Sequence, residues 1–260
     1  MLTTGQELML NWNKDVKDFV DEFTDGARNR IRYSREIEEI LKGLDNGLTL
    51  DQVKIYASRE FNAFEMEQIR LGFEHGLSVE QAGVYAKPEF SILQMEEIRT
   101  GFEHGLTIEQ VEFYAAPRFS PNLGGASNQL EQIRLGFEHG LTMEQIKVYA
   151  KPEFVWPQMY QIRWGLQDNL SQEQINLLAN PEFNSHQMRE IRKGFADGLS
   201  MEQVKAYAAP RVDFHEMAAI REGLKSGKFV VCSLAEAKFN TLELDLEKIA
   251  EIIEEEKNGK

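Results

Sequence analysis

A segment that recurs at a nearly fixed interval constrains this chain more than any other feature. Its clearest copy spans residues 91–119 and reads SILQMEEIRTGFEHGLTIEQVEFYAAPRF. Aligning the copies on their Ile-Arg pair gives arginines at intervals of 29, 35, 29, 29 and 29 residues: Arg70, Arg99, Arg134, Arg163, Arg192 and Arg221. A degenerate copy is centred on Leu41. Short units of this kind bury a core only by stacking on one another, so the pattern predicts a solenoid.

The negative charge of the chain belongs to the repeat itself. The sequence has 29 Lys and Arg against 43 Asp and Glu, a formal charge of −14. Residues 62–90 and residues 91–119 each contain five acidic and two basic side chains. A distributed negative field disfavours direct binding to nucleic acid or to an anionic membrane and attracts basic surfaces. We therefore expect a protein partner with a basic or mixed surface.

The cysteine content and the N-terminus bear on the compartment. A single cysteine, Cys232, rules out an internal disulfide framework and fits a reducing environment. The first residues lack the basic and apolar regions of a secretory signal, and no stretch approaches the roughly 20 apolar residues of a membrane span. These features predict a cytoplasmic protein.

Each unit carries the start and stop signals of two helices. The first helix begins at a capping box, as at Ser91 with Gln94, and ends at a glycine such as Gly105. The second begins at Thr107 and is expected to stop before Pro117, because the residue before proline disfavours helix. The sequence therefore predicts an all-α fold, an α-solenoid of stacked two-helix repeats.

The repeats are flanked by segments of different character. We expect an N-terminal helical cap over residues 1–33, tandem repeats over residues 34–227 forming six full units and a half-unit, and a C-terminal cap over residues 228–260 with an acidic helix. A six-residue insertion falls within residues 120–128 and fits either a surface loop or a recognition loop. An apolar stripe, exemplified by Met66, Ile69 and Phe73, packs each first helix inward.

Glycine also recurs inside the first helix, where it costs about 1 kcal/mol relative to alanine. The positions are Gly43, Gly72, Gly101, Gly136, Gly165, Gly194 and Gly223. We infer that helices of successive units approach closely at these glycines.

Two rows of side chains raise the question of chemistry. His75, His104 and His139 occupy one repeat position, but equivalent positions on packed helices lie about 8–10 Å apart, too far to share a zinc ion whose ligands each lie about 2 Å from it. No metal site is expected. The row of arginines fits either an anion-binding groove or stems packed beside the core with their guanidinium groups on glutamates.

No catalytic motif is present: the sequence contains no nucleophile elbow, phosphate loop, paired-carboxylate motif or dinucleotide fingerprint. We expect no cofactor and no enzymatic activity.

The position that follows the arginine differs from unit to unit, whereas packing positions agree. Since an irregular partner does not require identical units, this variation marks a candidate binding face made of Leu71, Thr100, Leu135, Trp164 and Lys193, with Lys42 and Glu222 at its ends. Trp164 is the expected anchor, because tryptophan is common at the centre of interfaces.

The assembled motif reads F-x-x-x-Q-M-x-x-I-R-x-G-F-x-x-G-L-S/T-x-E-Q-V-x-x-Y-A-x-P-E-F. It resembles the short helical repeats of poorly characterised proteins from anaerobic Gram-positive bacteria and their mobile elements, over about residues 35–227. The resemblance implies no activity or ligand. In general plan the chain is also similar to tetratricopeptide and Sel1-like arrays, although the former has longer units of about 34 residues.

These observations favour a non-enzymatic protein-binding scaffold. The alternative is an acidic inhibitor whose glutamates imitate a nucleic-acid backbone and block a basic nucleic-acid enzyme, as in the counter-defence proteins of mobile elements.

Overall fold

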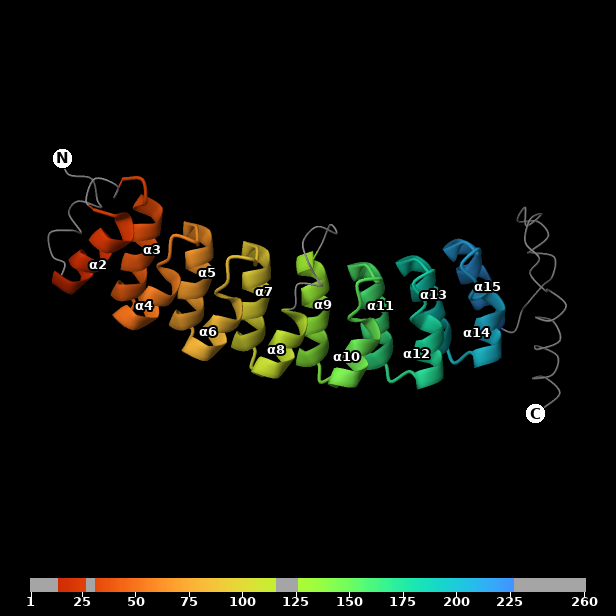
Figure 1. Ribbon diagram of the computed structural model, residues 1–260. Helices are drawn as coiled ribbons and strands as arrows, with labels where there is room; N and C mark the ends of the chain where they lie inside the picture. Colours follow the sequence, from red (N-terminus) through yellow and green to blue (C-terminus); the bar gives the residue numbers. More distant parts are fainter. Residues whose placement is uncertain (1–13, 27–30, 116–125, 227–260) are drawn as a thin grey trace. The chain divides into compact units, whose positions relative to one another are not determined.

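The computed structural model describes residues 14–26, 31–115 and 126–226, and every regular element in these ranges is a helix. Figure 1 shows long and short helices in alternation. The helices are α2 (Lys14–Thr24), α3 (Ser34–Asp45), α4 (Leu50–Tyr56), α5 (Ala63–Glu74), α6 (Val79–Tyr85), α7 (Ile92–Glu103), α8 (Ile108–Tyr114), α9 (Ala126–Glu138), α10 (Met143–Tyr149), α11 (Trp156–Gln167), α12 (Gln172–Leu178), α13 (Ser185–Ala196), α14 (Met201–Tyr207) and α15 (Phe214–Ser226). The predicted all-α fold is confirmed.

The chain divides into two compact units, residues 1–138 and residues 139–260. In the first unit the long helices α3, α5, α7 and α9 pack in sequence, and the short helices α4, α6 and α8 each pack against the long helix before and after. In the second unit the long helices α11, α13 and α15 pack in the same way, with α12 and α14 between them and α10 against α11. Each unit therefore has the packing pattern of a two-helix repeat solenoid.

Local capping chemistry sets where the helices begin. The side chain of Ser91 accepts from the Gln94 N–H, and Gln94 Oε1 accepts from the Ser91 N–H, so that two otherwise unpaired donors are satisfied. Complete boxes of the same kind open α4, α5, α6, α8, α10, α12, α13 and α14. The predicted helix starts are confirmed at these positions.

The turn between the two helices of a hairpin needs a left-handed residue, and the structure supplies one in each unit. Gly76 has φ of 89°, and Asn169, which replaces glycine once, has φ of 58°. The N–H of Gly76 donates to Phe73 O, and the following Leu77 N–H donates to Gly72 O, which closes the first helix as a Schellman-type turn.

The short helices end earlier than their prolines require. α8 stops at Tyr114, three residues before Pro117, and the Ala115 N–H completes the last turn on Val111 O. α4 ends at the equivalent Tyr56, although Arg59 stands where the other units have proline. The prediction that the second helix stops before its proline is confirmed. The ending of α4 shows that the proline is not required for this stop.

The core is made of the predicted stripes. Met66, Ile69 and Phe73 are buried in α5, and the second helices contribute Val111 and Tyr114 from α8. Equivalent residues are buried throughout the described helices, and several tyrosines are completely inaccessible: Tyr56, Tyr85, Tyr114, Tyr149 and Tyr207.

The glycines inside the first helices allow a close approach, but the approaching group is not the one we inferred. A Cβ built on Gly101 would lie 2.0 Å from the hydroxyl oxygen of Tyr114, which belongs to the second helix of the same hairpin. Gly43, Gly72 and Gly194 face the tyrosines Tyr56, Tyr85 and Tyr207 in the same way. The close contact therefore lies within a hairpin, not between successive units.

The tyrosine hydroxyl then finds an acceptor on the first helix. Tyr56 donates to Glu39 O at 3.2 Å, and Tyr207 donates to Glu190 O at 3.2 Å. Glycine thus makes room for a buried hydroxyl that ties the two helices of a hairpin together. Burial raises the pKa of Tyr56 and Tyr207 above the ordinary tyrosine value, so both remain neutral donors.

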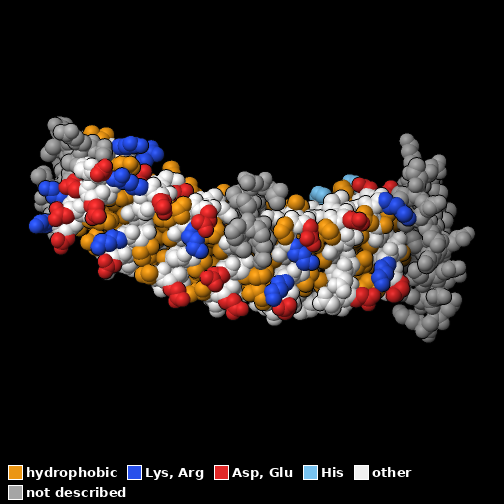
Figure 2. All heavy atoms as spheres, viewed as in Figure 1, with side chains coloured by type: hydrophobic (Ala, Val, Ile, Leu, Met, Phe, Trp, Pro, Cys, Tyr) orange, Lys and Arg blue, Asp and Glu red, His pale blue; other side chains and the backbone are white. Residues whose placement is uncertain are grey.

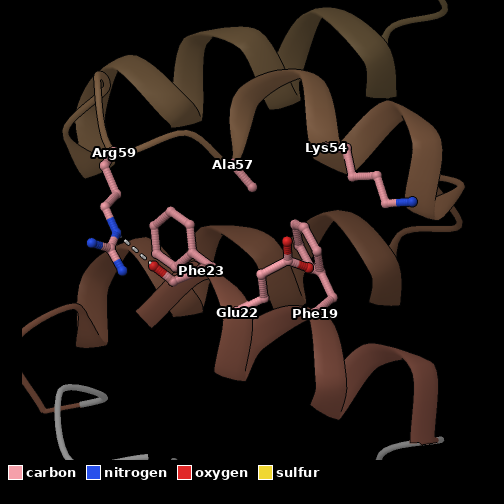
Figure 3. Close-up of a pocket in the computed structure, with 6 residues that line it drawn as sticks. All are labelled: Phe19, Glu22, Phe23, Lys54, Ala57 and Arg59. Carbon is pink, nitrogen blue, oxygen red and sulfur yellow. Dashed lines mark hydrogen bonds between the residues drawn. The ribbon is translucent and has the colours of Figure 1, made fainter. Parts of the chain in front are cut away.

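The ends of the repeat array are described only in part. α2 ends at Thr24, and Asp25 and Gly26 follow with positive φ. Figure 3 shows a hollow where α2 faces the end of α4, lined by Phe19, Glu22, Phe23, Lys54, Ala57 and Arg59. There Arg59 Nε donates to Phe23 O at 2.8 Å, which fastens α2 to the first hairpin.

Several predicted features lie outside the described residues. These are the N-terminal part of the cap with Leu8 and Trp12, the C-terminal cap with Cys232 and its acidic helix, and residues 120–125 of the insertion. α9 begins at Ala126, so the last three residues of the predicted loop are helical.

Candidate binding surface

The row of arginines is held inside the first unit by carboxylates. Arg70 Nε donates to Glu39 Oε2 of the preceding hairpin at 2.8 Å, and its Nη1 donates to Glu74 Oε1 at 2.6 Å. Arg134 repeats this arrangement with Glu97 at 2.9 Å and Glu138 at 2.7 Å. Since these guanidinium groups are buried and paired, the pairing interpretation is confirmed for them and an anion-binding groove is not formed.

Arg99 shows a neutral version of the same contact. Its Nε donates to Gln68 Oε1 at 3.3 Å, and its Nη1 forms a short bond to Glu103 on the same helix. Glu103 is thus the carboxylate that compensates the charge of Arg99.

For Arg192 and Arg221 of the second unit, the carboxylate bound by Nη1 comes from the other side of the interface. Arg192 Nη1 donates to Asp168 Oδ2 at 3.0 Å, and Arg221 Nη1 bonds closely to Asp197. Both aspartates are C-cap residues of the preceding first helix. The position four residues after the arginine, which is glutamate in the first unit, is Ala196 after Arg192 and Lys225 after Arg221.

The histidines lie at helix ends and bind carboxylates. His75 Nδ1 lies 2.8 Å from Glu103 Oε1, and His104 Nδ1 lies 2.8 Å from Glu138 Oε1. Among the described residues no group of three or more histidine, cysteine, aspartate or glutamate side chains could hold a metal ion. No helix in this part of the chain is long and apolar enough to cross a membrane.

The residues of the predicted binding face fall in both units. Leu71, Thr100 and Leu135 are half-buried on α5, α7 and α9, three long helices that pack in sequence in the first unit. Trp164 and Lys193 lie on the neighbouring helices α11 and α13 of the second unit. Trp164 is exposed, with 38 % of the accessible surface of the whole residue in solvent.

Trp164 does not stand alone on α11. Trp156, Tyr160 and Trp164 recur every four residues and therefore share one face of the helix. All three are exposed, at 40 %, 36 % and 38 %. We call this set the aromatic ridge.

Cations hold the rings of the aromatic ridge. The guanidinium carbon of Arg163 lies 5.4 Å from the ring centroid of Tyr160 and 5.7 Å from that of Trp164. From α13, the guanidinium carbon of Arg192 lies 5.9 Å from the Trp164 ring, and the Tyr160 and Trp164 centroids are 6.0 Å apart. These distances are those of cation–π contacts, which restrict the rings without covering them.

The sequence analysis identified Trp164 and missed Trp156 and Tyr160. The signal was available, because three aromatic residues at spacing four are visible in the printed sequence. A comparison of equivalent positions in different repeats does not reveal the ridge, because the ridge runs along a single helix.

The two units differ in the residue type at the position three residues before the arginine. It is occupied by glutamate on every long helix of the first unit, and all four side chains are exposed or half-buried: Glu38, Glu67, Glu96 and Glu131. In the second unit it is occupied by Tyr160, Arg189 and Ala218. Figure 2 shows acidic side chains distributed along the visible face of both units, in agreement with an acidity that belongs to the repeat.

Comparison with models of protein families, with curated proteins and with solved structures gives no match in any of the three. The resemblance to repeats of anaerobic Gram-positive bacteria and their mobile elements therefore stays a prediction, whereas the helical-repeat architecture rests on the structure itself.

Proposed function

We propose that this chain is a non-enzymatic, cytoplasmic protein-binding scaffold that uses the outer faces of its first helices. The aromatic ridge is the observation that supports this proposal. Each of these three residues keeps more than a third of its accessible surface in water, and rigid aromatic side chains are the commonest anchors of protein interfaces. On α13 the same positions hold Ser185, Arg189 and Lys193, so stacking of the repeat does not require the rings.

The predicted residues of the first unit form a row of their own. Leu71, Thr100 and Leu135 give the first unit a partly apolar row beside its glutamates. Such a row suits a partner with a basic or mixed surface, as the charge of the chain suggests.

The direct test is substitution of the anchor. The full chain is used as bait in its source cell extract, the captured protein is identified by mass spectrometry, and its affinity is then measured with purified components. Trp164→Ala is expected to weaken binding by at least about 1–2 kcal/mol, the scale of an interface hot spot, while the melting temperature stays within a few degrees.

Phe64→Ala is the matched control, since Phe64 is an exposed aromatic residue of the first unit and lies outside the ridge. Equal affinity of Trp164→Ala and the unaltered chain would remove the ridge from the interface. A large loss of stability would instead assign Trp164 to packing.

The row of glutamates in the first unit supports a second candidate, the acidic inhibitor that imitates nucleic acid. Glu38, Glu67, Glu96 and Glu131 lie on consecutive helices, which places one carboxylate about every 8–10 Å along the row. Binding of a basic nucleic-acid enzyme to such a row would fall steeply with salt. Affinity that hardly changes between low and high salt would exclude this candidate and leave the scaffold.

A further inference from the structure

The aromatic ridge has basic neighbours at matching positions on the next long helix. α11 and α13 pack together within the second unit. Tyr160 and Arg189 occupy the same repeat position on the two helices, and so do Trp164 and Lys193. A segment lying over both helices would therefore meet rings on one side and cations on the other.

The cations of α13 are only partly neutralised. Arg189 Nε lies 3.3 Å and Lys193 Nζ lies 3.1 Å from Glu190 Oε1, while the buried Arg221 binds the other oxygen of the same carboxylate at 3.1 Å. Arg221 also pairs with Asp197 and Glu222, whereas Glu190 is the carboxylate that Arg189 and Lys193 share. Arg189 and Lys193 keep roughly two fifths of their side chains in solvent, at 41 % and 44 %. Positive charge therefore reaches the surface beside the ridge, in a chain whose total charge is −14.

The spacing of the rings suits a helix. From Trp156 to Trp164 the ridge rises through eight residue steps, or about 12 Å at 1.5 Å per residue. Apolar side chains on a partner helix recur every three or four residues, so two turns of such a helix match the ridge in length. Because Arg163 and Arg192 already restrict Tyr160 and Trp164, little ring mobility is lost on binding.

We propose that the surface formed by Trp156, Tyr160, Trp164, Arg189 and Lys193 binds an amphipathic helix of a partner protein that carries acidic residues along one edge. This assignment rests on the proposed scaffold function and specifies the chemistry of its partner at this site. The apolar edge of the helix lies on α11, and its carboxylates face Arg189 and Lys193.

Aromatic rings beside cations are also found in proteins that bind single-stranded nucleic acid, where bases stack on the rings. The net negative field of the chain opposes phosphates and carboxylates alike, but a nucleic acid brings one phosphate with every nucleotide and therefore meets the larger repulsion. A carboxylate-bearing helix needs to satisfy only two surface cations.

The test uses the full chain labelled with nitrogen-15 and a synthetic 18-residue helical peptide with leucines on one edge and glutamates beside them. The indole N–H signals of Trp156 and Trp164, assigned with Trp156→Phe and Trp164→Phe, report on the site directly. We expect both signals to move on titration. A peptide with lysine in place of every glutamate is expected to bind at least about tenfold more weakly, since charge complementarity is lost.

A pair of charge variants localises the effect. Arg189→Gln with Lys193→Gln is expected to weaken the acidic peptide at least about tenfold. Lys151→Gln with Lys205→Gln removes the same charge from two similarly exposed cations of the second unit and is expected to leave affinity within about twofold. Circular dichroism melting verifies that both double variants are folded, and single Lys193→Gln replaces the first if it is not.

Three results would overturn the proposal: equal binding of the acidic and basic peptides, equal loss in the two double variants, or tighter binding of a 20-nucleotide oligothymidine at physiological salt. If no peptide moves the indole signals while Trp164→Ala still lowers capture of the cellular partner, the scaffold function stands and the acidic helix is the wrong partner.

Discussion

The two units solve one problem, the burial of an arginine beside each interface, with carboxylates from opposite sides. In the first unit the carboxylate lies on the arginine's own helix, as Glu103 does for Arg99. In the second it lies at the end of the preceding helix, as Asp197 does for Arg221. The C-cap residue of the preceding helix changes too: it is histidine in α5 and α7 and asparagine in α3, whereas it is aspartate in α11 and α13.

This difference shows that a carboxylate beside the arginine is retained, although the residue that supplies it changes. His75, on the preceding hairpin, contacts Glu103. The second unit has aspartate at the position of His75 and alanine at that of Glu103. Making both replacements would again give Arg99 a carboxylate, now from across the interface. Compared position by position, the change from histidine to aspartate and the change from glutamate to alanine look unrelated. The structure shows that together they move the carboxylate from one side of the interface to the other.

The largest expected effect comes from removing a carboxylate of the first unit. Glu103→Ala leaves the buried Arg99 with the neutral Gln68 and is expected to destabilise the chain by about 3 kcal/mol, as for other broken buried pairs. Adding His75→Asp is expected to restore most of this loss. Urea unfolding of both single variants and the double variant gives the coupling energy. Additive losses would show that the two units do not share one charge arrangement.

The glycines inside the first helices give a second contrast. Gly101→Ala drives its new methyl group against the buried Tyr114 hydroxyl, whereas at Gly165 the nearest group is a flexible Leu178 methyl at 2.7 Å. Overpacking costs about 1–3 kcal/mol and alanine returns about 1 kcal/mol of helix propensity. We expect Gly101→Ala to lose about 2 kcal/mol and Gly165→Ala to lose less than about 1 kcal/mol, by the same unfolding assay.

Adding Tyr114→Phe tests whether the tyrosine hydroxyl, and not another group of the hairpin, causes the loss of stability. If the hydroxyl is the obstacle, the double variant Gly101→Ala with Tyr114→Phe recovers stability relative to Gly101→Ala alone. A loss that persists would place the obstacle elsewhere in the hairpin.

Two glutamates at one repeat position provide the smallest and sharpest contrast. Burial raises the pKa of Glu97 above the ordinary glutamate value, against the opposing effect of Arg134. Burial acts on Glu190 too, but hydrogen bonds from Lys193 and Arg221 hold its pKa below that value. The neighbours explain the difference, because Glu96 and Thr100 stand beside Glu97 where Arg189 and Lys193 stand beside Glu190.

The contributions of these two glutamates to the free energy of unfolding depend on pH in opposite directions. The contribution of Glu190 is present above the unfolded pKa of about 4.3 and is lost as pH falls through the lower folded value. That of Glu97 is present below the unfolded pKa and is lost as pH rises through the higher folded value. We expect carboxyl carbon-13 titrations to place Glu190 below and Glu97 above the ordinary value, and Thr100→Lys to lower the pKa of Glu97. Coinciding titration curves would contradict this explanation.

The sequence predicted the helices well because their signals are local. A helix start depends on a capping residue such as Ser91 and its partner Gln94, and a helix end depends on the glycine that follows. These signals act within a few residues, so the helix boundaries of each repeat can be predicted from that repeat alone. The source of the close contact at Gly101 was not predictable in this way, since the tyrosine that fills the space is thirteen residues away and its direction depends on packing.

The candidate site was predictable in part. Comparison across units identified Trp164, but Trp156 and Tyr160 required reading along one helix, and the cations of Arg163 and Arg192 required the fold. The binding roles of Leu71, Thr100, Leu135, Trp164 and Lys193 stay predictions.

Within each unit, the contact from an arginine to the preceding hairpin gives the stacked repeats a direction. Arg70 takes its acceptor from Glu39, and Arg221 takes its acceptor from Glu190, two residues before the preceding anchor position. The first hairpin has Leu41 instead of the donor, and the last long helix has Ala219 instead of the acceptor. An extra hairpin stacked at either end would thus leave one polar group unmatched. This polar contact therefore joins only those neighbouring hairpins in which one carries the donor and the other the acceptor.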